Sequence, residues 1–395
     1  MTPAARTQAA IELLDGITAA ARDGGAAADT LIARFFAARR YAGSKDRRAI
    51  RTLVYDAIRL IGERPPSGRA AMLALIKAQP ALAETFDGSS YGPAKVDPGE
   101  AAARVGLAPA WLRKLLEASG IDDAELTALL GRAPLDIRVN TLMGSREDAA
   151  ALFPGAEPVP AVPDALRLPA DTPVETNPAA NGGLVEVQDA GSQIVAAVAG
   201  AAPGMTVVDL CAGAGGKTLA LAAAMTNQGR IVATDTDRAR LQRLAPRAER
   251  AGVTIVESRL LDPNEEANAL TDLTDAADVV LIDAPCSGTG TWRRNPEARW
   301  RLSQARLDRL IATQARLLDL GATLVRPGGA VVHIVCSLLD GEGAGQVAAF
   351  LARHPGWTVE PPQAGAGRPH GAGLRLTPAH DATDGFFVAR LIRPC

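Results

Sequence analysis

Residues 205–218, MTVVDLCAGAGGKT, decide the fold of this chain. The apolar run 205–210 is typical of a buried strand, and the glycines after it allow a tight turn and a close backbone approach to a ligand. The next residues, TLALAAAM (218–225), have the apolar spacing of a helix. A helix that begins directly after such a turn offers free N–H groups at its N-terminus. This unit therefore predicts an α/β sheet with a ligand site at the turn.

The same alternation of strand and helix continues towards the C-terminus. Strand-like segments separated by turns and helical stretches are GRIVATD (229–235), TIVESRLLD (254–262), DVVLIDAP (278–285), GGAVVHIVCS (328–337) and GFFVARLI (385–392). Repeated strand–helix units predict a doubly wound, mainly parallel sheet, whose ligands bind beyond the carboxyl ends of the strands. We expect this α/β domain to occupy residues 185–395.

The first third of the chain has a different pattern. Apolar residues recur at three- and four-residue spacing in AAIELLDGITAAA (9–21) and RRAIRTLVYDAIRLI (47–61), which predicts an all-helical domain over residues 1–128. Between the two domains, LDIRVNTLM (135–143) indicates a short strand and is followed by a Pro-rich run. We expect residues 129–184 to form a small connecting subdomain.

Composition limits the function classes. Of 395 residues, 47% are hydrophobic and 22% charged, as in an ordinary soluble globular protein, and the net charge of −2 means that nucleic-acid contacts must come from local patches. The N-terminus lacks the continuous apolar region of a signal peptide, and no long apolar stretch follows, so we expect a cytoplasmic protein without membrane contact. Four scattered cysteines without a CxxC pair predict reduced thiols and no metal site.

The glycine-rich turn leaves two alternatives for its ligand. Residues 216–218, Gly-Lys-Thr, match the end of a phosphate-binding P-loop, but Cys211 stands where that loop needs its first glycine. Asp235 ends the next strand, roughly 20 residues beyond the turn, where a carboxylate holds ribose hydroxyls. This pattern favours a cofactor that contains a nucleoside over a nucleoside triphosphate bound by a P-loop. The alternative is a glycine turn beside a surface aspartate that only caps a helix.

Two cysteines stand at ends of predicted strands. Cys286 follows Asp283 in DAPC, and Cys336 follows the next long strand. A single cysteine is more often inert and buried, or the two could form a disulfide, but a reduced compartment disfavours the disulfide. Carbon 5 of cytosine is a poor nucleophile until a thiolate adds to carbon 6, and a carboxylic acid such as Asp283 near N3 would assist that addition. A second group near the first thiol would assist elimination.

These motifs resemble the Sun/Nol/Nop family of RNA cytosine-5 methyltransferases, and within it the RsmB type. The matching segments are RVN (138–140), VQDAGSQ (187–193), DLCAGAGGKT (209–218), ATD (233–235), DAPCSGTG (283–290), RRNPEARW (293–300), VCS (335–337) and DGFFVARL (384–391). The resemblance implies a Rossmann-like class I S-adenosylmethionine-dependent methyltransferase domain preceded by an all-helical NusB-like domain. It also implies an RNA substrate, small-subunit (16S) rRNA, and we expect a monomer.

The resemblance further implies the roles of individual residues. Cys336 matches the nucleophile, Cys286 the thiol that assists product release, Asp283 the acid that contacts the base near the cofactor, and Lys217 a lysine close to the substrate. The residues that match the S-adenosylmethionine site are Cys211, Ala212, Gly213, Ala214, Gly215, Gly216, Lys217, Asp235, Arg240, Asp262 and Asp283.

Departures from the family pattern keep alternatives open. Val335 stands where threonine usually precedes the nucleophile, and of a Glu-Asn-Glu run only Glu342 remains. The alternatives are a tRNA cytosine-5 methyltransferase and a catalytically compromised RNA-binding or ribosome-assembly protein. A DNA methyltransferase with Cys286 as the nucleophile is disfavoured because it leaves Cys336 without a role.

A cluster of basic residues in the helical domain could contact RNA phosphates, although a charged stretch is more commonly a solvated helix face. Its members are Arg34, Arg39, Arg40, Lys45, Arg47, Arg48 and Arg51.

Overall fold

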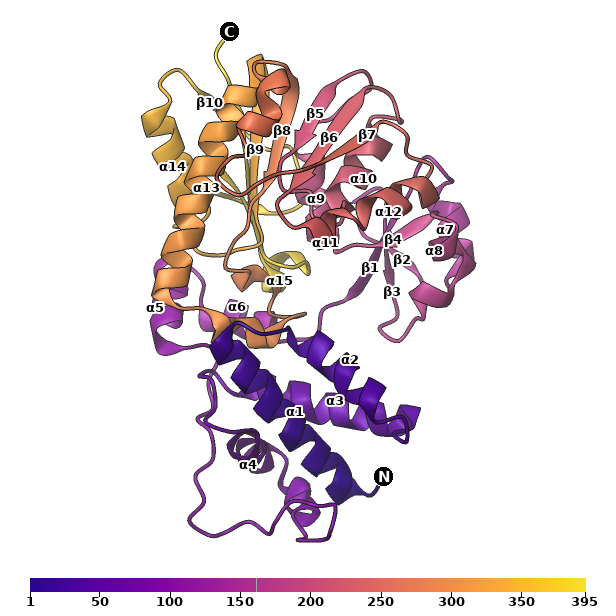
Figure 1. The fold of residues 1–395 in the computed structure, drawn as a ribbon, viewed down its shortest axis with the longest axis vertical. Coiled ribbons are helices and arrows are strands. Elements are labelled where there is room, and N and C mark those ends of the chain that lie inside the picture. The colour runs from indigo at the N-terminus through magenta and orange to yellow at the C-terminus, as the bar shows by residue number, and fades with distance from the viewer. Residues whose placement is uncertain (161) are drawn as a thin grey trace. The chain divides into compact units, whose positions relative to one another are not determined.

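The chain forms two compact units. The structure is a computed structural model that describes residues 1–160 and 162–395 (Figure 1). One unit, here the helical unit, consists of Met1–Arg132 and Thr291–Ser303. The other, the sheet unit, consists of Ala133–Gly290 and Gln304–Cys395. A segment from late in the chain therefore belongs to the N-terminal fold, whereas the boundaries expected at 128 and 184 remain predictions.

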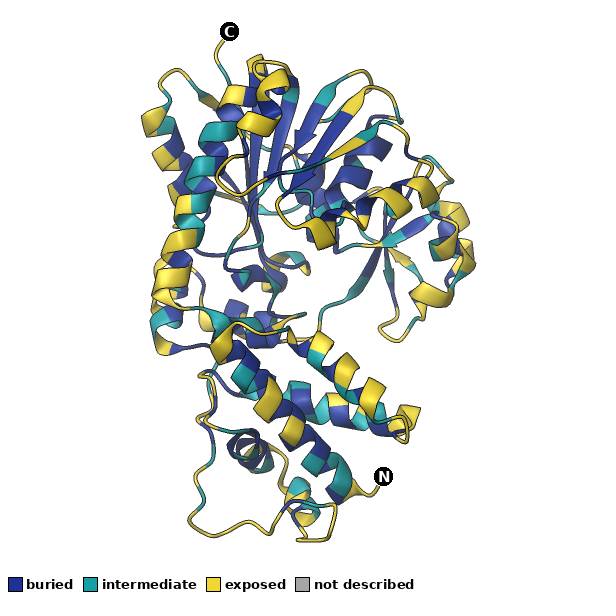
Figure 2. Ribbon diagram, viewed as in Figure 1, coloured by how far each residue is buried: buried dark blue, intermediate teal, exposed yellow. Residues whose placement is uncertain are grey.

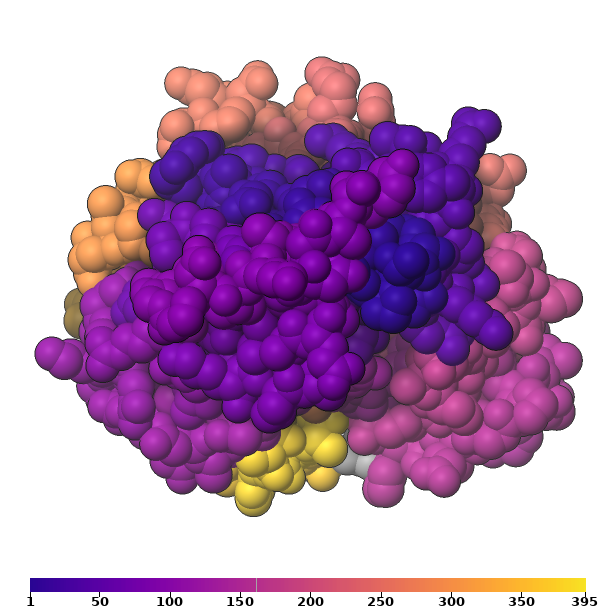
Figure 3. All heavy atoms as spheres, turned by 90° about the horizontal axis from the view of Figure 1, so that it is seen from below, coloured from indigo at the N-terminus to yellow at the C-terminus, as the bar shows by residue number. Residues whose placement is uncertain are grey.

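The helical unit confirms the all-helical character expected of the first third. Its α-helices are α1 (Pro3–Asp23), α2 (Ala28–Ala38), α3 (Ser44–Leu60), α4 (Gly68–Ala78), α5 (Ala110–Ala118) and α6 (Asp123–Leu129), with the 3₁₀ helix η1 (Pro80–Thr85). The amphipathic spacing of α1 buries Leu14 and Ile17 against Ile50 and Ile58 of α3 and Met72 of α4. Figure 3 shows the N-terminal part of the chain, coloured indigo to purple, as one continuous surface.

Residues 291–303 complete the helical unit. Arg299, in the 3₁₀ helix η5 (Pro296–Arg301), is fully buried, and its Nη2 donates to the carbonyls of Ile58 at 2.6 Å and Ile61 at 2.8 Å. These carbonyls belong to the end of α3, where a helix lacks internal donors. Trp300 Nε1 also donates to Ile61 O, at 3.2 Å, and the Glu297 carboxylate accepts the Ala28 N–H that begins α2. The segment thus supplies the caps that two helices lack.

The sheet unit contains the expected doubly wound sheet. Its strands are β5 (Thr206–Asp209), β6 (Arg230–Asp235), β7 (Val256–Leu260), β8 (Ala277–Asp283), β9 (Val325–Val335), β10 (Thr358–Glu360), β11 (Arg368–His370), β12 (Gly373–Leu376) and β13 (Phe386–Ile392). They are ordered β11-β12-β13-β9-β8-β5-β6-β7, and β10 pairs with β13. The five neighbouring strands β9, β8, β5, β6 and β7 are parallel, and β13 is antiparallel to β9. The strand order reverses between β5 and β8, and ligands bind at such a switch point.

Helices cover both faces of this sheet. They are α9 (Ala190–Ala197), α10 (Gly216–Ala224), α11 (Arg238–Leu241), α12 (Leu244–Arg250), α13 (Gln304–Leu324), α14 (Ala344–Arg353) and α15 (Pro378–Asp381), with the 3₁₀ helices η3 (Asn268–Leu273) and η4 (Thr289–Thr291). One face packs Val207 and Leu281 against Leu219 of α10, and the other packs Val208 and Val280 against α13 and α14. Consecutive strand residues are therefore both buried, as Figure 2 shows for the central strands.

A small second sheet precedes the large one within the sheet unit. Its strands are β1 (Leu135–Val139), β2 (Glu157–Pro158), β3 (Ala165–Leu168) and β4 (Val185–Val187), in the order β2-β3-β1-β4, and its helices are α7 (Arg146–Leu152), α8 (Pro178–Asn181) and the 3₁₀ helix η2 (Val174–Thr176). Of the strand expected at 135–143, residues 135–139 form β1, whereas residues 141–143 form a turn. Asp136 of β1 is buried, pairs with Arg167 and accepts the Ala190 N–H at the start of α9. Among the described residues, no helix is long and apolar enough to cross a membrane.

The caps supplied by residues 291–303 predict a stability effect. We expect Arg299→Met to lower the stability of the helical unit by about 2 kcal/mol, because methionine fills much of the space but removes the charged donor that the buried carbonyls of Ile58 and Ile61 share. Thermal unfolding followed by circular dichroism would measure this change. The exposed Arg34 provides the control, since Arg34→Met should change stability by less than about 0.5 kcal/mol. An Arg299→Met protein as stable as the wild type would contradict the capping role.

Candidate active site

Three loops meet at the carboxyl edge of the parallel sheet. They follow β5, β8 and β9, which are neighbours: Asp209 lies opposite Leu281, and Asp283 lies opposite Ile334. In-register parallel strands end together, so Cys211, Asp283 and Cys336 come to the same edge. The sequence motifs thus converge here, although they are far apart in the chain.

A cavity of about 540 Å³ opens at this edge of the sheet unit. Six of the residues expected at the site line it: Cys211, Asp235, Arg240, Asp283, Cys286 and Cys336. The other expected residues do not line it, namely Ala212, Gly213, Ala214, Gly215, Gly216, Lys217 and Asp262. The volume and the mixture of apolar and polar walls are those of a small-molecule site.

The glycine-rich loop holds Asp235 in place. Gly213 adopts a φ of +57°, and its N–H donates to Asp235 Oδ2 at 2.8 Å, while the Asp237 N–H donates to Oδ1 at 2.7 Å. Gly215, with a φ of +86°, lies so close to Leu244 that a Cβ atom would stand 2.1 Å from Leu244 Cδ1. The loop therefore requires glycine at both positions.

The residues around Asp235 fit a ribose-containing cofactor. Each carboxylate oxygen of Asp235 accepts one backbone N–H and retains a lone pair that a ribose hydroxyl can use. Arg240 lies beside it, with its Nη1 3.9 Å from Asp235 Oδ2. Leu261 and Pro263 add apolar wall after β7. The geometry thus agrees with the chemistry expected for a nucleoside part.

Asp262, the acid expected after β7, has an exposed side chain and does not line the cavity, so its cofactor role stays a prediction. The same loop instead contributes Asn264 and the buried Glu266, whose carboxylate pairs with Arg316 of α13 at 2.5 Å. Sequence reasoning missed Asn264, Glu266, Arg316 and also Thr313 of α13. They belong to no motif: Asn264 and Glu266 had only the signal of a loop at the carboxyl edge of the sheet, and Thr313 and Arg316 of α13 had none.

Lys217 and Asp283 form an ion pair between β8 and the first turn of α10. Lys217 Nζ lies 2.6 Å from Asp283 Oδ2 and 5.6 Å from the centre of the Phe386 ring. Burial lowers the pKa of Lys217, but the charge and hydrogen bond of Asp283 outweigh it, so the pKa lies above its usual value. The charge of Cys336 acts in the same direction. Lys217 is therefore a permanent cation beside the thiols.

Asp209 is a second carboxylate behind the cavity. It is fully buried, and its Oδ2 accepts a hydrogen bond from Thr218 Oγ1 at 2.7 Å. Its Oδ1 has no hydrogen-bond partner among the described residues. Burial, assisted by the charges of Asp283 and Asp235, raises the pKa of Asp209 to about 7.

The two expected thiols are in contact. Cys286 Sγ and Cys336 Sγ are 3.4 Å apart, and both cysteines are free. The hydrogen bond with Cys336, together with burial, raises the pKa of Cys286 well above its usual value. The raised pKa favours the protonated thiol at Cys286, and either sulfur can be the donor in this contact. Among the described residues, no group of three or more His, Cys, Asp or Glu is placed to hold a metal ion.

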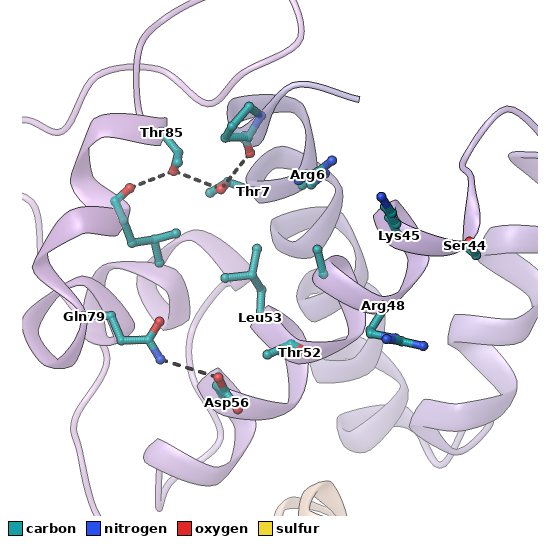
Figure 4. Close-up of a pocket in the computed structure, with 13 residues that line it drawn as sticks. Arg6, Thr7, Ser44, Lys45, Arg48, Thr52, Leu53, Asp56, Gln79 and Thr85 are labelled. Atoms are coloured by element: carbon teal, nitrogen blue, oxygen red, sulfur yellow. Dashed lines mark hydrogen bonds between the residues drawn. The ribbon is translucent and has the colours of Figure 1, made fainter. Parts of the chain in front are cut away.

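The helical unit has a cavity of its own, of about 680 Å³, between α1, α3 and η1 (Figure 4). Lys45 and Arg48 of the basic cluster line it together with Arg6. Arg6 is paired with Asp46 at 2.8 Å, whereas Lys45 and Arg48 are exposed and have no ion-pair partner in the part of the chain that the structure describes. Two members of the basic cluster are thus available for anions.

Comparisons with known proteins agree with this site. The family model described as 16S rRNA methyltransferase RsmB/F matches residues 198–392. Ribosomal RNA small subunit methyltransferase B of Xylella fastidiosa is 37% identical over 299 residues, which cover 72% of this chain and 67% of the relative. The protein of that name from Citrobacter koseri is 34% identical over 295 residues, with 73% and 67% covered. The chain thus spans about two thirds of the length of these relatives.

Solved structures share the fold. The crystal structure of PH0851 has a TM-score of 0.76 at 25% identity and covers 99% of both chains, so the similarity includes the helical region. A methyltransferase homolog protein from Pyrococcus horikoshii has a TM-score of 0.60 at 25% identity, over 72% of this chain and 99% of its own. NSun6 from the same organism, solved with SFG, has a TM-score of 0.64 at 20% identity, over 72% and 98%, and supports the fold alone. These similarities confirm the expected fold class.

The raised pKa of Asp209 predicts a pH effect on stability. The folded state holds the Asp209 proton up to about pH 7, whereas the unfolded state releases it near the usual value of 3.8. Stability from this group is therefore present at low pH and is lost as the pH rises through this range. We expect Asp209→Asn to unfold at a higher temperature than the wild type at pH 8, and this advantage to shrink by roughly 5 °C at pH 5.

Differential scanning calorimetry between pH 5 and pH 8 would measure the difference between the two proteins. Asp262→Asn, which removes an exposed carboxylate, is the control and should keep the wild-type pH dependence. A pH-independent difference between Asp209→Asn and the wild type would contradict the prediction.

Proposed function

We propose that this chain, which belongs to the RsmB/F family of 16S rRNA methyltransferases, methylates carbon 5 of a cytosine in RNA through a covalent cysteine–cytosine adduct. The family expected from the motifs is confirmed, and S-adenosylmethionine is the cofactor of this methyltransferase. The observation that carries the proposal is the 3.4 Å contact of Cys286 and Cys336 beside the Lys217–Asp283 pair.

Small-subunit rRNA is the proposed substrate. The curated relatives are named as ribosomal RNA small subunit methyltransferases, and the identity extends over 72% of this chain. A tRNA cytosine would require the same chemistry, because the site residues act on the base and not on its surroundings. We keep the cytoplasmic location and the monomeric state as predictions.

The cofactor supplies an electrophilic methyl group when bound. The loop from Cys211 to Lys217 would approach it with its backbone, and Asp235 would accept hydrogen bonds from the ribose hydroxyls. Arg240 lines the same part of the cavity and balances the charge of Asp235. Asp283 lines the same cavity at the end of β8, the strand between β5 and β9, and would contact both the cofactor and the base.

The electrostatics favour Cys336 as the nucleophile. A thiolate is stabilised by a nearby cation, and the Lys217 cation interacts with the charge of Cys336. Cys286 retains its proton and donates towards Cys336, which stabilises the Cys336 thiolate further. The raised pKa of Cys286 disfavours Cys286 as the attacking thiolate, which leaves Cys336 for that role.

The proposed addition balances protons and bonds. The Cys336 proton passes to Asp283, and the sulfur forms a bond to carbon 6 while N3 takes the proton from Asp283. The electron pair of the former C5=C6 bond becomes available at carbon 5, which then accepts the methyl group.

Elimination reverses the addition with the help of Cys286. The C6–S bond breaks, Cys286 gives its proton to the departing Cys336 sulfur, and the Cys286 thiolate takes the proton from carbon 5. Both thiols are then restored, and the remaining proton leaves N3 through Asp283. Without Cys286, the methylated adduct lacks both the donor that protonates the Cys336 sulfur and the base that removes the proton from carbon 5.

Cysteine substitutions test this assignment. With labelled S-adenosylmethionine and RNA that lacks the modification, we expect Cys336→Ala to lower methyl transfer by at least roughly 10³-fold and to form no adduct, because the nucleophile is absent. We expect Cys286→Ala to accumulate a covalent protein–RNA adduct on denaturing gels. The exposed Cys395 provides the control, and Cys395→Ala should behave as the wild type.

An adduct in Cys336→Ala, with none in Cys286→Ala, would reverse the two roles. A wild-type protein that methylates no RNA would instead support a catalytically compromised RNA-binding protein.

We further propose that Lys45 and Arg48 of the helical unit contact RNA phosphates. Both are exposed at one cavity, and each phosphate contact releases counterions. For the double variant Lys45→Ala/Arg48→Ala, we expect weaker RNA binding and a plot of log K against log salt that is less steep by about 1.4. Binding titrations at several salt concentrations would measure this slope. The exposed pair Lys77→Ala/Lys114→Ala is the control, and equal slopes in the two double variants would contradict the proposal.

A further inference from the structure

A buried carboxylate joins the two loops that carry the thiols. Glu342 follows β9 and is fully buried, and no described cation lies within ion-pair distance of it. Its Oε1 accepts the Ser287 N–H at 2.8 Å and Gln314 Nε2 at 3.0 Å. Its Oε2 accepts Ser337 Oγ at 2.5 Å and also Ser287 Oγ. Four donors thus satisfy the carboxylate without a counter-ion, which makes its burial tolerable.

These bonds attach directly to the thiol loops. Ser287 follows Cys286, and Ser337 follows Cys336, so one carboxylate holds the residue after each cysteine. The two serine hydroxyls also contact each other, with the Oγ atoms 3.1 Å apart. The backbone of Glu342 is fixed in turn, because its carbonyl bonds to His333 Nε2 at 2.9 Å. The link between the loops is therefore short and buried, and the residues that form it follow β8 and β9.

We propose that Glu342 is a positioning residue that sets the distance between Cys286 and Cys336. For its effect on catalysis, this inference rests on the proposed function, in which a proton passes between the two sulfurs during elimination. Proton transfer requires hydrogen-bond reach, and a displacement of about 1 Å can cost roughly 10²-fold in rate. Glu342 touches neither base nor cofactor cavity and acts only through the two loops.

The competing role for Glu342 is purely structural, as an anchor for the turn between β9 and α14. Both roles predict a loss of thermal stability in Glu342→Gln, so stability cannot separate them. They differ in the separation of the sulfurs, which phenylarsine oxide reports directly. One arsenic atom forms bonds to two neighbouring thiols and releases water, so tight binding requires both sulfurs at short distance.

We expect Glu342→Gln to bind phenylarsine oxide at least about tenfold more weakly than the wild type, because its amide keeps one acceptor oxygen but replaces the other, so the Ser287 and Ser337 hydroxyls lose the oxygen to which they donate. In single-turnover methylation, the variant should still form the RNA adduct through Cys336 but release product at least about tenfold more slowly, as Cys286→Ala does. Asp136→Asn, which removes a buried carboxylate of β1 far from these loops in sequence, is the matched control. It should lose stability but keep wild-type arsenical affinity and product release.

Ser287→Ala and Ser337→Ala provide the test if Glu342→Gln does not fold. Each variant removes one hydroxyl donor and keeps the carboxylate. Each should therefore weaken phenylarsine oxide binding and slow product release, as expected for Glu342→Gln. Wild-type arsenical affinity and product release in the folded variants would overturn the positioning role. Weakened arsenical binding with no RNA methylation by the wild type would support the positioning role and reject the proposed function.

Discussion

The parallel pairing of β5, β8 and β9 is the constraint on which the site depends. In-register pairing of Asp209 with Leu281 and of Asp283 with Ile334 makes the three strands end at one edge. The loops that follow must then share a small volume, which brings a glycine-rich turn, an acid and two thiols together. No single loop could place these groups, because each supplies only one or two of them. The chemistry is therefore a property of the strand order, in which the switch point lies between β5 and β8.

Burial of charge gives each group in this volume a distinct protonation state. Lys217 keeps its proton because Asp283 lies 2.6 Å away, whereas Asp209 has one hydroxyl donor and an unbonded oxygen, so burial raises its pKa. The hydrogen bond with Cys336, together with burial, raises the pKa of Cys286 and favours its protonated form. The two carboxylates of this site thus differ both in burial and in partners, since Asp209 is fully buried with one hydroxyl donor whereas Asp283 is partly exposed and paired with Lys217.

Much of this arrangement follows from the sequence alone, because motifs at strand ends must meet in a doubly wound sheet. The sequence identified the strand–turn–helix unit at 205–225 and the carboxylate of Asp235 in this way. It also identified the two cysteine motifs, DAPC (283–286) and VCS (335–337). Asn264 and Arg316 were not, because they reach the cavity through the path of a loop and the rotation of α13, which no local pattern encodes. Asp262 shows the same limit: the chain position after β7 was predictable, but the direction of its side chain was not. The part played by Arg299 in the helical unit was equally hidden, since its partners lie far earlier in the chain.

The path of the chain after Cys286 explains why the thiol loop needs internal anchors. Only a few residues beyond Cys286, the chain enters the segment Thr291–Ser303, which belongs to the helical unit. Gly290 is fixed immediately before this point, because its N–H donates to Cys336 O at 3.0 Å and its carbonyl accepts the Gly385 N–H at 2.8 Å. A side chain at Gly290 would collide with Gly385, since a Cβ atom would stand 2.0 Å from its oxygen. Together with Glu342, this contact ties the Cys286 loop to the residues that follow β9 and to Gly385, which directly precedes β13, so the position of the sulfur is fixed from within the sheet unit.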